Sequence, residues 1–137
     1  MSIKEREKEI ESEFEIFEDW MEKYEYIIDL GKELPEMLAS EKQPDNLIRG
    51  CQSQVWLTAR NEEGKVSFNA DSDAIITKGL VALMMRVLDG QKPEDIVSSE
   101  LKFIDTIGLQ EHLSPNRSNG LVAMIKQMKV YALALKK

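Results

Sequence analysis

The sequence has 137 residues and a net charge of -7, which predict a single domain over residues 1–137 and disfavour nucleic acid as a partner. Its apolar runs are shorter than the roughly 20 residues that cross a bilayer, and its charged beginning is unlike a secretory signal, so we expect a cytoplasmic protein without a membrane span. The single cysteine cannot form an internal disulfide, and a reducing compartment keeps it a free thiol.

Two amphipathic helices are predicted at the start of the chain. Ile10, Phe14 and Phe17 recur at helical spacing among charged residues, which indicates the first helix. Asp19 can cap the second helix, and Gly31 suits a left-handed stop at its end. The apolar stripe of this second helix comprises Trp20, Tyr24, Ile27 and Ile28.

The hydrophobic period then changes from helical to alternating. Small or aliphatic residues alternate with larger or more polar ones over 55–60 and 66–70, on either side of the turn residues 61–64, a pattern that predicts an antiparallel hairpin. Leu47 and Ile48 are candidates for a third short strand.

Further helices are predicted after the hairpin. Asp71 or Ser72 can cap a helix that runs to Gly90, Pro93 can open a short helix, and the Ser-Pro pair at 114–115 can open the last one. Strands grouped between helices predict an α+β fold, in which a small antiparallel sheet of about three strands packs against helices on one face. The apolar stripes of the two longer helices are Ile76, Leu80, Leu83, Met84, Val87 and Leu88, then Leu121, Met124, Ile125, Met128, Tyr131 and Leu135.

Cys51 is the strongest candidate for chemistry. It follows Gly50 in a polar segment between two apolar runs, where glycine permits a sharp turn and the close approach of another molecule. A buried structural thiol fits this local pattern equally well. A thioredoxin-type site needs a second cysteine and a structural zinc site needs more ligands. The sole histidine, His112, is more typical of a surface or packing residue than of the base in a cysteine hydrolase.

Persulfide transfer is a reaction that needs one cysteine and no resident base. The acceptor thiolate attacks the outer sulfur of a donor persulfide, and the donor thiolate leaves. Arg49, Arg60 or the beginning of the helix after Ser72 can favour the thiolate if they lie near it. We also expect Gly50 to act as a hinge that lets Cys51 shelter against the apolar residues at positions 47, 48, 55 and 57 until a partner docks.

Three blocks of the sequence resemble the signature blocks of the SufE family of sulfur acceptors. They are GCQSQVWL at 50–57, DSDAIITKGL at 71–80 and LSPNRSNGLVAMI at 113–125, and EKYEYIIDLGKELP at 22–35 is similar to the family's second helix. The resemblance implies a fold similar to the IscU scaffold proteins. It also implies that Cys51 takes sulfur from the PLP-dependent cysteine desulfurase SufS, stimulates its turnover and delivers the sulfur to iron–sulfur cluster assembly.

The resemblance further implies supporting residues and partners. Gly50, Gln52, Asp73 and Arg117 are expected to support the Cys51 site or to dock the desulfurase. Residues 116 and 119 are asparagines where Ser and Gln are common in relatives, which are small polar exchanges. We expect no metal or cofactor in the chain itself, since PLP belongs to the desulfurase. The expected partners are that enzyme and a downstream cluster-assembly scaffold, and the expected state is a monomer or weak homodimer.

Three other interpretations stay open on the sequence. A CsdE-like acceptor feeds a different sulfur-transfer pathway, although the Gln-Ser-Gln triplet at 52–54 is more similar to the SufE branch. An IscU-like cluster scaffold is disfavoured because scaffolds hold clusters with several cysteines. In an interaction module, Cys51 would only pack, and its alkylation would stay slow, unlike that of a carrier thiol on a loop that opens.

Overall fold

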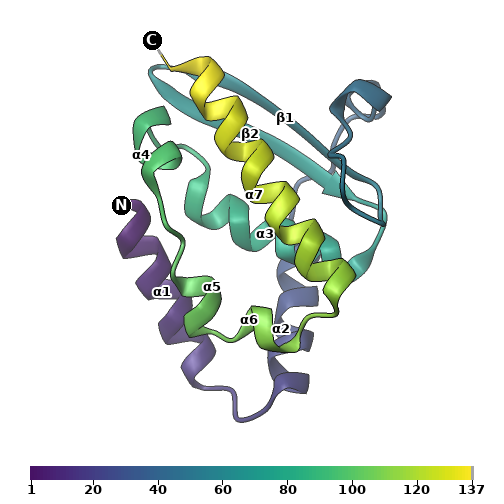
Figure 1. The fold of residues 1–137 in the computed structure, drawn as a ribbon, viewed down its shortest axis with the longest axis vertical. Coiled ribbons are helices and arrows are strands. Elements are labelled where there is room, and N and C mark those ends of the chain that lie inside the picture. Colours follow the sequence, from purple (N-terminus) through teal and green to yellow (C-terminus); the bar gives the residue numbers. More distant parts are fainter. Residues whose placement is uncertain (137) are drawn as a thin grey trace.

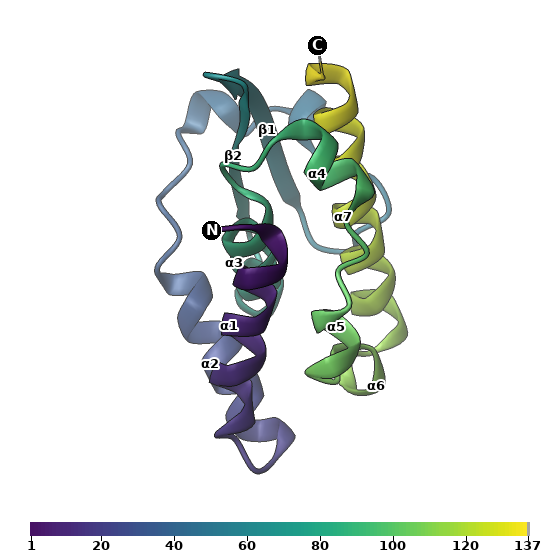
Figure 2. The same cartoon turned by 90° about the vertical axis from the view of Figure 1, so that its left-hand side faces the viewer.

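The structure is a computed structural model that describes residues 1–136. In chain order its elements are α1 (Ile3–Glu15), α2 (Trp20–Lys32), the short 3-10 helices η1 (Ala39–Glu41) and η2 (Pro44–Asn46), β1 (Val55–Glu62), β2 (Lys65–Ser72), α3 (Ile75–Leu88), α4 (Pro93–Ser98), α5 (Phe103–Thr106), α6 (Leu109–His112) and α7 (Pro115–Leu135). Helix α7 crosses one face of the hairpin formed by β1 and β2 (Figure 1). Helices α4 to α7 lie on one side of the molecule and α1 and α2 on the other (Figure 2), and α3 contacts α1, α2 and α7.

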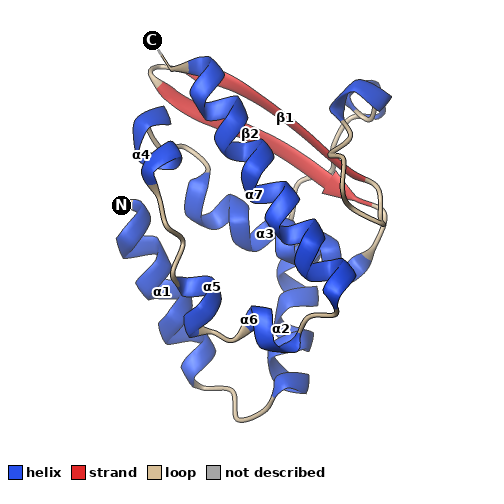
Figure 3. Ribbon diagram, viewed as in Figure 1, coloured by secondary structure: helices blue, strands red, loops and turns tan. Residues whose placement is uncertain are grey.

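The predicted α+β class is confirmed, but the sheet has two strands rather than about three (Figure 3). Leu47 forms only an isolated bridge with Trp56, and Ile48 adds one backbone hydrogen bond to Val55. Helix η2 ends at residue 46, and Gly50 has a φ of 93° that turns the chain away, so too few extended residues remain for a third strand.

The hairpin is longer and its turn shorter than predicted. Strand β1 pairs with β2 in antiparallel register from Val55 with Ser72 to Glu62 with Lys65. Only Glu63 and Gly64 remain in the turn, and both have positive φ values, of 55° and 86°. Two-residue turns of this kind match the twist of the strands they join, so pairing continues through residues expected in the turn.

One face of the hairpin lies against the helices. Val55, Leu57, Val66, Phe68 and Ala70 alternate along the two strands and are buried in one connected apolar cluster with residues of α3 and α7. The predicted stripes of these helices are buried or half-buried, and their methionines fill the core. No helix within residues 1–136 is long and apolar enough to span a membrane.

Most predicted helix starts are confirmed. Asp19 caps α2, Ser114 caps α7, and Pro93 occupies the beginning of α4. Helix α1 begins earlier than its apolar stripe suggested, because Ser2 forms a capping box. It ends at Glu15, before Phe17.

Two predictions about helix ends are wrong. The N-cap of α3 is Ala74 and not Asp71 or Ser72, although the Ser72 hydroxyl accepts a hydrogen bond from the Ala74 N–H. Gly31 does not end α2 in a left-handed conformation but lies inside the helix, buried against α3. A Cβ at Gly31 would lie 2.7 Å from the backbone nitrogen of Gly79, so the glycine is required for close helix packing.

Candidate functional site

Cys51 lies in a short loop between Ile48 and Val55, which we call the Cys51 loop (residues 49–54). The Ile48 N–H donates a 2.8 Å hydrogen bond to the Val55 carbonyl and closes the base of the loop. Ile48 is buried, and Gly50 adopts the left-handed region that glycine alone enters without strain. Because the base of the loop is closed, the cysteine can move only with the few residues between 48 and 55, and Gly50 can accommodate the change in backbone conformation.

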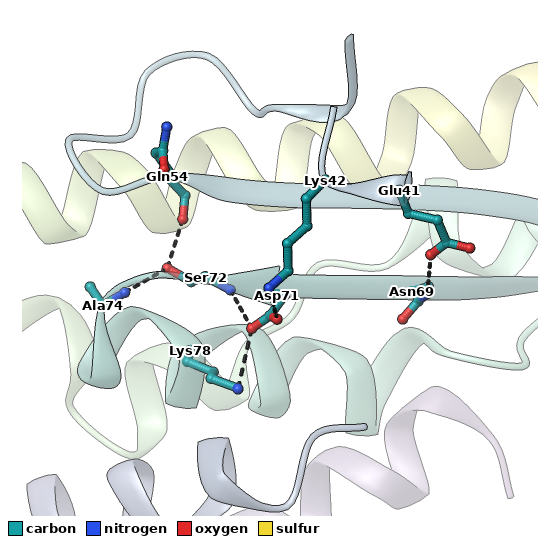
Figure 4. Close-up of polar contacts among 8 residues, drawn as sticks. All are labelled: Glu41, Lys42, Gln54, Asn69, Asp71, Ser72, Ala74 and Lys78. Carbon is teal, nitrogen blue, oxygen red and sulfur yellow. Dashed lines mark hydrogen bonds and ion pairs between the residues drawn. The ribbon is translucent and has the colours of Figure 1, made fainter. Parts of the chain in front are cut away.

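The end of the loop is anchored to the residues that follow β2. The Gln54 N–H donates to the Asp73 carboxylate at 3.0 Å, and the Asp73 N–H donates to the Gln54 carbonyl at 3.2 Å. The Ser72 hydroxyl donates to the same carbonyl at 2.9 Å, as Figure 4 shows. Asp73, predicted as a supporting residue, therefore contacts the loop backbone and is not among the residues that line the cavity beside Cys51.

The Cys51 side chain points toward α7 and is half-buried. Its thiol donates a hydrogen bond to the Gly120 carbonyl, with 3.6 Å between Sγ and the oxygen. A Cβ at Gly120 would lie 3.6 Å from Sγ, at ordinary van der Waals distance. The thiol thus lies directly against the helix backbone.

A cavity of about 390 Å³ adjoins the thiol. Gln52 and Arg117, both predicted as site residues, line it, whereas Gly50 supports the loop without lining it. The apolar part of the lining comes from α3 and α7 and not from positions 47, 48, 55 and 57, which the sequence suggested as cover. The complete lining is Cys51, Gln52, Ser53, Thr77, Leu80, Ser114, Asn116, Arg117, Gly120, Leu121 and Met124.

Burial dominates the electrostatics of the resting thiol and raises the pKa of Cys51 above its usual range. The predicted cation Arg60 is not a partner, because its exposed side chain pairs with Glu62 at 3.6 Å. Arg49 is likewise exposed and outside the cavity. The first turns of two helices do line the cavity, α3 through Thr77 and α7 through Asn116 and Arg117. The positive ends of both helices favour an anion in the cavity. The sequence predicted this effect for the helix after Ser72, which is α3, and the structure adds α7.

Arg117 is held by an aromatic residue of α2. Its guanidinium carbon lies 5.9 Å from the centre of the Tyr24 ring, within cation–π range. Nearby, Trp20 stacks on His112 with ring centres 4.6 Å apart, which agrees with the packing role predicted for this histidine. Trp20 and Tyr24 were predicted to lie in a core stripe, and their contacts around the beginning of α7 were missed at the level of sequence.

The three sequence blocks come together around the thiol. Cys51 and Gln52 belong to the first block, Thr77 and Leu80 to the second, and the α7 residues of the lining to the third. Thr77 and Gly120 were missed as site residues, although membership in these blocks was a signal that could have found them. Within residues 1–136 no three His, Cys, Asp or Glu side chains gather as a metal ion requires.

Comparison with known proteins agrees with this arrangement. The solution structure of a hypothetical protein from Thermus thermophilus superposes with a TM-score of 0.78 at 20% sequence identity, covering 95% of each chain, which shows a shared fold. The model of the family described as "SufE: Fe-S metabolism associated domain" matches residues 8–132, a range that includes the whole Cys51 site. This chain belongs to the SufE family, whose members are associated with iron–sulfur metabolism.

Proposed function

We propose that this protein is a sulfur acceptor, which takes persulfide sulfur onto Cys51 from a SufS-like, PLP-dependent cysteine desulfurase. It raises the turnover of that enzyme by removing its product and delivers the sulfur for iron–sulfur cluster assembly. The observation that carries the proposal is the setting of Cys51, which lies on a short loop beside a cavity that the first turns of two helices line. The family supplies the metabolic context.

The chemistry is an exchange at sulfur. The Cys51 thiolate attacks the outer sulfur of the donor Cys–S–SH, a new S–S bond forms, and the donor S–S bond breaks. The donor cysteine leaves as a thiolate and takes up a proton, which balances the proton lost from Cys51. One sulfane sulfur moves with no net oxidation, so the chain needs no cofactor of its own.

The resting contacts of the loop suit a carrier that protects its cargo. The raised pKa of Cys51 and its hydrogen bond to Gly120 keep the thiol unreactive before docking. Movement of the Cys51 loop away from α7 removes both restraints while Gly50 accommodates the backbone change. Exposure to water then removes the burial that raises the pKa of Cys51, so the thiolate forms more readily.

The supporting residues have different tasks in this proposal. Gly50 is the hinge, and Asp73 fixes the end of the loop through Gln54. Gln52 and Arg117 are polar groups at the cavity that the desulfurase can contact. Tyr24 restricts the orientation of Arg117 through ring contact. The protein would act in the cytoplasm as a monomer or weak homodimer, and a cluster-assembly scaffold would receive the sulfur.

The proposal is tested by mixing the protein with a SufS-like desulfurase and L-cysteine and measuring the intact mass. We expect a gain of one sulfur atom on Cys51 that a reductant removes, and no gain in Cys51→Ser, which is nearly isosteric. A desulfurase whose active-site cysteine is alkylated serves as the second control. If Cys51→Ser still stimulates the desulfurase fully, activation does not proceed through a carrier persulfide.

The movement of the loop has its own test. Alkylation of Cys51 in the isolated protein should be slower than that of a small free thiol, because the residue is half-buried and its pKa is raised. Adding the alkylated desulfurase, which can dock but cannot donate sulfur, should accelerate the reaction. Equal rates with and without it would exclude partner-induced opening and leave sulfur acceptance unaffected.

A further inference from the structure

Asp71 is a buried carboxylate that binds two lysines from different parts of the chain. Its side chain is 3% exposed and lies 3.1 Å from the ammonium of Lys42 and 3.2 Å from that of Lys78. Figure 4 shows the two lysines reaching Asp71 from opposite directions. Burial alone would raise the pKa of Asp71, but these lysines and the Ser72 N–H outweigh it and lower the pKa. The carboxylate is therefore charged and paired.

The two lysines attach different elements to Asp71. Lys78 lies on α3, which already packs against β2 through the apolar core. Lys42 follows η1 and belongs to the connection between α2 and β1 that leads into the Cys51 loop. The Lys78 pair thus joins two elements that the core holds together, whereas the Lys42 pair fastens an irregular segment.

Further contacts place this segment, residues 39–48, on the hairpin. The Asn69 amide donates a hydrogen bond to the Glu41 carboxylate, and the Lys42 ammonium lies 5.4 Å from the centre of the Trp56 ring. Trp56 is paired with Leu47 on one side and with Asp71 on the other. The segment is therefore held against the hairpin directly before the base of the Cys51 loop.

Three consecutive residues at the end of β2 hold both limbs of the loop. Asp71 binds Lys42 on the limb that enters, while Ser72 and Asp73 bind Gln54 on the limb that leaves. In the view of Figure 4, Gln54 and Lys42 both lie above this part of β2, Gln54 bound to Ser72 and Lys42 to Asp71. Releasing Lys42 would loosen residues 39–48 and with them the Ile48 to Val55 hydrogen bond at the base of the loop.

We propose that Lys42 and Asp71 are positioning residues for Cys51: their ion pair clamps residues 39–48 to the hairpin and keeps the thiol in its sheltered place against α7. The consequence for sulfur transfer rests on the proposed function, but the clamp itself is a property of the isolated protein. Because Asp71 keeps one lysine when the other is removed, the two lysines provide a matched pair for an experiment.

The experiment compares Lys42→Met, Lys78→Met and Lys42→Arg by the rate at which iodoacetamide alkylates Cys51, measured well below each melting temperature. Methionine keeps much of the apolar stem, so the loss is mainly that of the charge. We expect Lys42→Met to accelerate alkylation by about three-fold or more through local opening, and Lys78→Met to leave it nearly unchanged although both variants lose one Asp71 pair. Lys42→Arg, which restores a cation, should return the slow rate.

Equal acceleration in the two methionine variants would overturn the proposal, since lost stability alone would then expose the thiol. Unchanged rates in both, or a fast rate in Lys42→Arg, would also overturn it. Sulfur acceptance from a desulfurase is measured separately in the same proteins. If the alkylation rates follow the expected pattern but the protein accepts no sulfur, only the proposed function is refuted. If the protein accepts sulfur but the alkylation rates do not follow the pattern, only the clamp is refuted.

Discussion

Glycine allows close packing at two contacts of the molecule, one between α2 and α3 and the other between α7 and the Cys51 loop. The two contacts differ in how much space they leave. At the first, a Cβ on Gly79 would lie 2.2 Å from the Ile27 carbonyl oxygen, and Gly31 meets α3 in the same manner. At the second, a Cβ on Gly120 would meet the Cys51 sulfur at 3.6 Å, and a cavity of about 390 Å³ lies alongside.

This difference separates a rigid part of the protein from one that can move. Backbone packed directly against backbone leaves no alternative arrangement, so α2 and α3 form a fixed support. The loop meets α7 where Gly50 passes Ala123 and where the Cys51 thiol makes one weak hydrogen bond beside a cavity, and these contacts can be exchanged at small cost. A site that must shelter a persulfide and then present it to a partner needs the second kind of contact.

The largest expected effect is that of Gly79→Ala. The new methyl group would overlap the Ile27 carbonyl, and overpacking of this kind costs roughly 3 kcal/mol or more of unfolding free energy when backbone must move. Urea denaturation measures the loss. A cost below about 1 kcal/mol would show that α2 and α3 can separate easily and would contradict the rigid half of the comparison.

Acid should weaken the protein through Asp71. The lowered pKa of this carboxyl means that its contribution to stability is complete above its unfolded pKa of about 3.9 and is lost as the pH falls through the folded value. The difference in unfolding free energy between the wild type and Asp71→Asn should therefore be larger at pH 7 than at about pH 3. Urea titrations at both values measure it, and an equal difference at the two pH values would show that the ion pairs contribute nothing.

Gly120→Ala should have the opposite sign from Gly79→Ala. Alanine is favoured over glycine inside a helix by up to about 1 kcal/mol, and the methyl group has room, so α7 should become slightly more stable. The same methyl covers the sulfur, and alkylation of Cys51 should slow by about two-fold. Asn119→Ala, at an exposed position of α7, is the control that changes helix propensity without touching the thiol.

The smallest effect concerns the pH dependence of Cys51 itself. Because burial raises the pKa of the thiol, alkylation of the folded protein should require a higher pH than alkylation of the same chain unfolded in urea. The ratio of the two rates should be largest below the usual thiol pKa of about 8.5 and should shrink as the pH rises. Coincident pH profiles would mean that Cys51 is exposed at rest.

Local patterns predicted the α+β class, the hairpin, several helix caps and the cysteine that carries the proposed chemistry. These features depend on neighbours in the sequence, such as the period of the apolar residues or a serine before a proline at 114–115. The resemblance to the SufE blocks further predicted that the Cys51 loop and the beginning of α7 belong to the same site. The prediction was wrong where one residue type has two possible structural roles. Gly31 was expected to end a helix, but it allows α2 to pack closely against α3.

Long-range contacts were beyond the reach of these patterns. The apolar lining beside Cys51 comes from α3 and α7 because the tertiary packing brings positions 80, 121 and 124 to the loop. The ion pairs of Asp71 join positions 42, 71 and 78, and no period in the sequence links a lysine before a strand to an aspartate in the next one. Propensity and pattern act over a few residues, whereas burial and charge pairing depend on which segments meet once the chain has folded.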